Sequence, residues 1–209
     1  MASNLKYSAV LKNNQQAQIT STVGTSGLIN IMGGPQRANP DTALANTTLA
    51  STITTSQTTI TLTSATGFPA SGSYTLWVGA EQMTVTGGQG TASLTVTRGV
   101  NGSTALASAS GTAITNTPVL AALACSATLA PAPSAGVLTM NAITSGTGTT
   151  AAGAGSTATW YTITTSGGTS HVDGTCGVTS GFDMNFVGSA SIATGQPVGD
   201  TSFTLANGN

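Results

Sequence analysis

Thr58-Thr59-Ile60-Thr61-Leu62-Thr63 is the stretch that decides the fold class of this chain. On an extended strand, Ile60 and Leu62 face one side and the threonines between them face the other. The same period of two recurs in short runs as far as the C-terminus. Segments rich in Gly, Ser, Thr, Ala and Pro separate these runs, which is typical of β-sandwiches and small barrels.

Eleven further segments have the length and pattern of strands. We predict strands at 27–32, 74–78, 81–86, 93–97, 112–115, 119–124, 137–142, 158–165, 171–177, 183–186 and 201–205. Asn101-Gly102 is a strong signal for a tight turn. The low-complexity stretch 146–156 predicts a mobile loop.

One segment has a helical pattern. Residues 8–22 combine a ragged apolar spacing with many Asn and Gln side chains, and Gly24 would end the helix. No helical segments alternate with the later strands, which disfavours a parallel α/β sheet. The predicted fold class is therefore all-β, with two small β-sandwich or barrel domains and a short N-terminal helix or arm.

A similarity between two segments of the sequence suggests how the domains are arranged. Residues 46–50 resemble 116–121, and if the residues between are removed, Leu44-Ala45 runs into Thr117-Pro118. We interpret 46–116 as a small β-domain inserted into a loop of a discontinuous host domain, 1–45 plus 117–209. The alternative is two consecutive domains with an N-terminal arm. Insertion predicts that residues 28–32 pair within the C-terminal sheet.

Charge is almost absent from the 209 residues. Only 4% are charged and the net charge is −1, although 39% are hydrophobic. Four dispersed cations make no basic patch, so we expect neither direct nucleic-acid binding nor attachment to an anionic membrane. We find no targeting signal and no apolar run long enough to span a bilayer. A surface this neutral favours association with neighbouring molecules.

The few reactive side chains give no catalytic pattern. His171, the only histidine, precedes Asp173 by two residues, so both would face one side of a strand. Further metal ligands would have to come from Cys125, Cys176, Glu81, Asp183 and Asp200, which have no recognisable ligand spacing. We expect a strand-edge histidine near a turn aspartate, no enzyme, no catalytic or metal site and no cofactor. We expect the two cysteines to be buried free thiols, with a disulfide as the alternative.

The remaining candidates are one charged pair and four aromatic residues. Glu81 and Arg98 could pair across a sheet as an exposed ion pair, or could contact a neighbouring subunit. Tyr74, Trp77 and the adjacent Trp160 and Tyr161 could stack on sugars. We expect Trp160 to point into the core and Tyr161 to point outward.

Several segments carry a resemblance to tailed-bacteriophage virion proteins. The proposed host domain resembles a family of small virion proteins at 6–13, 26–31, 134–143, 155–161 and 170–177. The proposed insert resembles a recurrent phage β-module at 67–69, 79–86 and 96–105. His171 and Cys176 depart from what we expect of such proteins. The resemblance implies no catalytic or ligand residues.

The resemblance implies a structural role in the virion. We expect a capsid decoration or cement protein that binds the major capsid protein or other virion proteins, as a homo-oligomer or symmetric array. Residues 1–24 would clamp onto neighbours and the insert would project outward. A neck, collar or tail-surface protein is the alternative, and a secreted carbohydrate-binding domain is the third. The chain would be made in the bacterial cytoplasm and would reside on the head, neck or tail.

Overall fold

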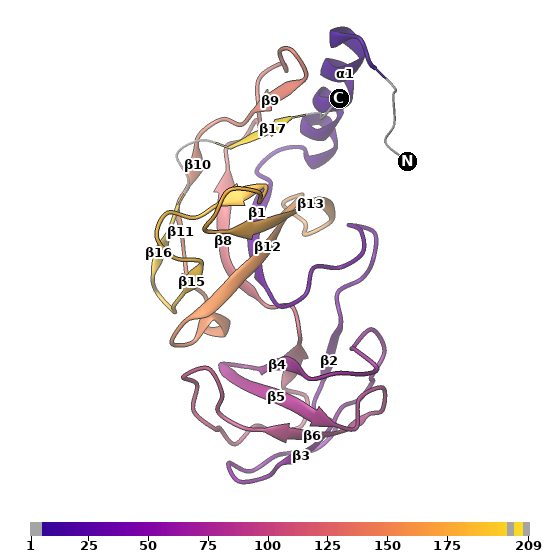
Figure 1. Cartoon of the computed structure of the whole chain (residues 1–209), viewed down its shortest axis with the longest axis vertical. Coiled ribbons are helices and arrows are strands. Elements are labelled where there is room, and N and C mark those ends of the chain that lie inside the picture. The colour runs from indigo at the N-terminus through magenta and orange to yellow at the C-terminus, as the bar shows by residue number, and fades with distance from the viewer. Residues whose placement is uncertain (1–5, 200–202, 207–209) are drawn as a thin grey trace.

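The computed structural model describes residues 6–199 and 203–206. It is mostly β, with one short N-terminal helix and two curled sheets that each form a half-barrel. The predicted all-β class with an N-terminal helix is confirmed. Figure 1 shows the smaller sheet at one end of the long axis and the helix at the other.

Helix α1 spans Ala9–Val23, close to its predicted range. Ser8 caps it, because the Leu11 N–H donates to Ser8 Oγ at 3.2 Å. Gly24, with φ of 73°, ends it and donates its N–H to the Thr20 carbonyl. Only Gln16 and Val23 of this helix are buried, so α1 contacts the rest of the protein along a narrow and partly polar stripe.

The large sheet has seven strands and combines the two ends of the chain. Its order is β10-β8-β1-β12-β13-β14, with β15 paired to β12. Its strands are β1 (Leu28–Gly33), β8 (Val119–Cys125), β10 (Ile143–Thr144), β12 (Ser156–Thr164), β13 (Ser170–Gly177), β14 (Met184–Asn185) and β15 (Ser191–Ile192). Two short ribbons flank it, made of β11 (Gly146–Thr147) with β16 (Pro197–Val198), and β9 (Val137–Thr139) with β17 (Thr204–Ala206).

Strand β1 lies between β8 and β12 and is antiparallel to both. Residues from before position 34 and after position 118 therefore share one sheet and one core, which includes Ile29, Leu123 and Ile163. This pairing is the one expected if residues 46–116 are an insertion. The domain boundaries themselves stay a prediction.

The small sheet is built from residues 46–115 alone. Its six strands are β2 (Asn46–Thr48), β3 (Thr59–Thr61), β4 (Tyr74–Val78), β5 (Glu81–Gly87), β6 (Ser93–Thr97) and β7 (Ala113–Thr115), in the order β2-β7-β4-β5-β6-β3. A bridge between Leu49 and Leu62, just beyond the two edge strands, curls the sheet toward closure. The alternation in 58–63 is confirmed, because Ile60 and Leu62 enter the core of this sheet and Thr59 and Thr61 are exposed.

Two local expectations have opposite outcomes. Asn101 and Gly102 form the predicted tight turn, and both have positive φ, 52° and 78°.

The prediction of a mobile loop at 146–156 is wrong. That stretch contains β11 and the 3₁₀ turn η1 (Thr150–Ala152), and Ala152 is fully buried. Thr149 also binds the β8 backbone, since its N–H donates to the Leu120 carbonyl.

Gly34 marks the place where the chain leaves β1 for the small sheet, and it is a sensitive position. Its φ is 75°, and a Cβ there would lie 1.9 Å from the Asn116 carbonyl oxygen. Gly72 has the same φ of 75° but nothing within 4 Å of an added Cβ. The two glycines therefore separate the cost of backbone conformation from the cost of a steric clash.

We predict that Gly34→Ala destabilises the protein by about 1–3 kcal/mol more than Gly72→Ala, because only Gly34→Ala adds overpacking to backbone strain. Urea unfolding of the two variants measures the difference. Equal losses of stability would contradict the close approach of residues 34 and 116.

Candidate functional site

Arg98 and Glu81 form a two-pronged ion pair inside the small sheet. Arg98 Nε lies 2.7 Å from Glu81 Oε1, and Nη2 lies 2.7 Å from Oε2. The pairing expected from the sequence is confirmed, but the expected exposure is wrong. The side chains are only 6% and 0% exposed, respectively. Two loops from other parts of the chain cover the pair. The alternation of residues within one strand gives no sign of this cover, so the burial was not predicted.

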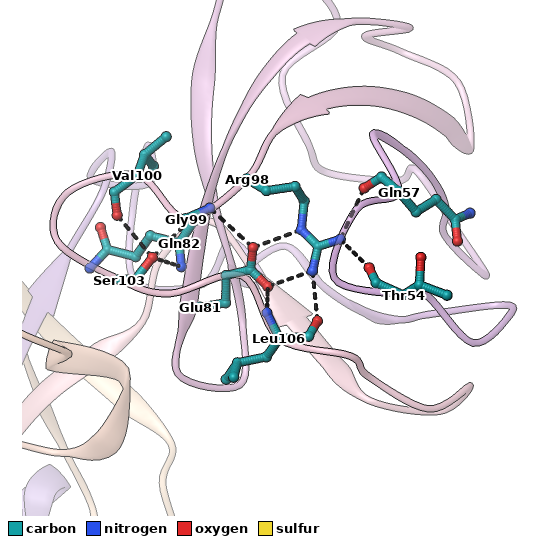
Figure 2. Close-up of polar contacts among 9 residues, drawn as sticks. All are labelled: Thr54, Gln57, Glu81, Gln82, Arg98, Gly99, Val100, Ser103 and Leu106. Atoms are coloured by element: carbon teal, nitrogen blue, oxygen red, sulfur yellow. Dashed lines mark hydrogen bonds and ion pairs between the residues drawn. The ribbon is translucent and has the colours of Figure 1, made fainter.

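All five guanidinium N–H groups of Arg98 have acceptors (Figure 2). Besides Glu81, they donate to the carbonyls of Thr54, Gln57 and Leu106, at 2.6, 2.9 and 2.6 Å. Glu81 in turn accepts the backbone N–H groups of Gly99 and Leu106. The pair therefore ties β5 to the loops around 54–57 and 99–106, and its polar atoms are engaged within the protein.

A second ion pair of the same form lies at the large sheet. Arg37 Nε and Nη2 approach the two Asp173 carboxylate oxygens at 2.7 and 2.8 Å, and both side chains are buried. Nη2 also donates to Thr162 Oγ1, and the guanidinium carbon lies 5.6 Å from the Trp160 ring centroid. The segment around Arg37 is thereby held across β12 and β13.

Arg37 changes the interpretation of the His171–Asp173 pair. Asp173 is a strand residue within β13, so its expected position in a turn is wrong. Both of its carboxylate oxygens bind Arg37, and no hydrogen bond or ion pair joins it to His171 in the described structure. Asp183 is exposed and accepts the N–H and the hydroxyl of Thr175. Asp200 lies outside the described residues.

The two cysteines are buried free thiols, as expected. Burial raises the pKa of Cys125, and burial together with the Asp183 carboxylate raises the pKa of Cys176 to about 12. Cys176 Sγ lies 3.9 Å from Met184 Sδ. Across 6–199 and 203–206, no three His, Cys, Asp or Glu side chains lie close enough together to hold a metal ion.

Trp160 and Tyr161 lie on opposite faces of β12, yet both are buried. Tyr161 belongs to the hydrophobic core of the large sheet, and Trp160 is buried on the opposite face, so the predicted orientation of the two side chains is wrong. Phe203 packs edge-on against the Tyr161 ring with centroids 5.3 Å apart, while Arg37 covers Trp160. Burial raises the pKa of Tyr161, because the phenolate would lose its water. Both faces of the large sheet are therefore covered, which single-strand periodicity did not predict.

Most exposed apolar side chains lie outside the small-sheet segment, residues 46–115. The described residues include eight large hydrophobic side chains that are exposed: Tyr7, Val10, Leu11, Leu106, Val119, Val178, Phe182 and Val187. Only Leu106 comes from the small-sheet segment. Tyr7, Val10 and Leu11 gather at the start of α1, and we call these three residues the α1 tip. These three exposed apolar side chains lie within five residues of the chain, so one partner surface could cover them.

Comparison with known proteins adds no relative: no protein-family model, curated protein or solved structure matches this chain. No helix among the described residues is long and apolar enough to cross a membrane.

We predict that Glu81→Gln lowers the free energy of unfolding by about 3–5 kcal/mol, because it leaves the Arg98 charge buried without its counter-charge. Asp41→Asn, at an exposed aspartate, is the matched control and should change stability by about 0.5 kcal/mol or less. Urea unfolding measures both variants. Similar small losses in the two would show that the Glu81–Arg98 pair is not a buried clamp.

We also predict that iodoacetamide at about pH 8 alkylates neither cysteine in the folded protein and both in urea, because the raised pKa values keep the thiols protonated and burial blocks access. The same shifts predict that stability falls as the pH rises above 9, the usual thiol value, since the unfolded chain then releases protons that the folded chain retains. Mass spectrometry after a timed reaction counts the labelled sites. Rapid labelling of the folded protein would contradict the buried positions.

Proposed function

We propose that this chain is a structural component of a tailed-bacteriophage particle. It binds the major capsid shell as a decoration or cement protein, through multiple weak β-edge and apolar contacts. The observation that carries the proposal is the distribution of exposed apolar side chains, since seven of the eight lie outside the small-sheet segment 46–115. The rest of the chain supplies the surface for the shell, and the small sheet projects away from it.

The near absence of exposed charge supports this role. Arg37, Arg98, Glu81 and Asp173 are paired inside the protein, so half of the four Lys and Arg residues are withdrawn from the surface. A weakly charged surface has little repulsion to oppose close packing against copies of itself or against a shell. Weak contacts repeated by the symmetry of a particle then add up through avidity.

The position of α1 suggests how the chain would hold its neighbours. Figure 1 shows α1 at the end of the long axis opposite to the small sheet. The Val10 side chain is 69% exposed and Leu11 is 43% exposed. A shell subunit that covers the α1 tip would remove these groups from water, which is favourable by about 25 cal/mol per Å² of apolar area.

The proposed clamp at 1–24 is better tested by surface substitution than by deletion. Residues 1–5 lie outside the described structure, and Val23 belongs to the core of the large sheet. Loss of the whole segment would therefore disturb the fold as well as the contact. The α1 tip can be changed without removing a buried side chain.

We predict that the triple variant Tyr7→Ser, Val10→Ser and Leu11→Ser folds normally but loses most of its binding to particles that lack the protein, because the apolar contact is gone. Purified variant and wild-type chains are added to such particles, and the bound fraction is measured on a stained gel. Leu106→Ser, 44% exposed in the small-sheet segment, is the control and should bind like wild type. Full occupancy by the triple variant would contradict the clamp, and wild-type copies bound only at the neck or tail would exclude a shell role.

A further inference from the structure

A groove lies at the junction of the two sheets. It has a volume of about 580 Å³, within the range of small-ligand sites. One wall comes from the small-sheet segment and includes Tyr74, Trp77 and Gln82. The other comes from the large-sheet segments and includes Pro35, Thr157 and Thr159. Residues far apart in the sequence thus build one concave surface.

We infer that this groove binds a neutral oligosaccharide. Among the described residues that line it, none is Lys, Arg, His, Asp or Glu. Hydroxyl groups, amides and aromatic rings make up most of the side chains. Such a surface lacks the charge that would select a phosphate, a carboxylate or a cation. It offers hydrogen bonds, which suit a ligand rich in hydroxyl groups and free of charge.

Trp77 supplies the second observation. Leu76 and Val78, its neighbours on β4, belong to the core of the small sheet, so Trp77 faces the opposite side. It is nevertheless buried, and its indole N–H has no hydrogen-bond partner. Buried donors are normally paired, so the unpaired indole N–H of Trp77 is a polar group that a ligand oxygen in the groove could satisfy.

The floor of the groove is held in place by hydrogen bonds that join the two sheets. Gln82 Nε2 donates to Ser156 Oγ at 2.6 Å, and Asn101 Nδ2 donates to Gln82 Oε1 at 3.0 Å. Ser156 Oγ donates onward to the Ala152 carbonyl. These hydrogen bonds hold the two walls relative to each other before any ligand arrives, which lowers the cost of binding.

A peptide fits the groove less well than a saccharide. At Trp77, β4 is already paired with β5 on one side and β7 on the other, so no free strand edge is offered there. The inference does not depend on a virion role, because the groove is formed within one chain.

The test is a titration of the ¹⁵N-labelled full chain with neutral oligosaccharides built from glucose, galactose, mannose or N-acetylglucosamine. The chain has two tryptophans, and Trp77→Phe identifies which indole N–H signal belongs to Trp77. We expect at least one saccharide to shift that signal in a saturable way. No shift with any neutral saccharide at millimolar concentration would overturn the inference, as would a response to charged saccharides or peptides alone.

Two matched variants locate the binding. Thr157→Tyr fills the groove from an exposed position, whereas Thr61→Tyr adds the same side chain at an exposed position on β3 outside it. Thr157→Tyr should weaken the affinity about tenfold or more and Thr61→Tyr should leave it unchanged. Thermal unfolding checks that both are folded. Equal affinity in the two variants would place the saccharide elsewhere and overturn the inference.

Discussion

In each sheet of this protein, one arginine meets one carboxylate in a buried, two-pronged ion pair. An ion pair taken out of water is stable only when its geometry is good and its remaining polar atoms are satisfied. Arg98 meets this condition by using all five of its N–H groups, four of them on the Glu81 carboxylate or on carbonyls of the covering loops at Thr54 and Gln57. At the large sheet, Arg37 donates hydrogen bonds to the Asp173 carboxylate and to the Thr162 hydroxyl. The loops of both sheets take their positions from these two arginines.

The same arrangement determines the character of the surface. Four charged side chains form the two buried ion pairs. Few charged side chains in the described structure are therefore exposed, and Lys6, Asp41 and Asp183 are among them. Threonine and serine then dominate the outer faces of the strands, as at Ser93, Thr95 and Thr97 of β6. A molecule of this kind has little to keep it apart from its neighbours. It also has an uncharged groove between its sheets, where hydroxyl and amide groups take the place that charged groups hold in many binding sites.

Sequence periodicity predicted the longer strands well, because burial on one face imposes a period of two that Leu94 and Val96 display plainly. It missed β2, β10, β11, β15 and β16, each of which has only two or three residues and lies in a stretch without longer alternation. The burial of Glu81 was missed for another reason. Its covering partner Arg98 reaches a carbonyl 44 residues away, and Arg37 reaches Asp173 across 136 residues. Contacts over such distances, like the groove itself, arise only from the way the two sheets meet.

We propose that the fold withdraws charge and leaves apolar groups exposed so that many copies can pack on a phage head. Electron cryo-microscopy of particles from a tailed phage that carries this gene tests it most directly. We expect repeated density for this chain over the head, with the large sheet and α1 against the shell and the small sheet outermost. Particles whose heads carry no copy of the chain, or carry it with the small sheet against the shell, would contradict it.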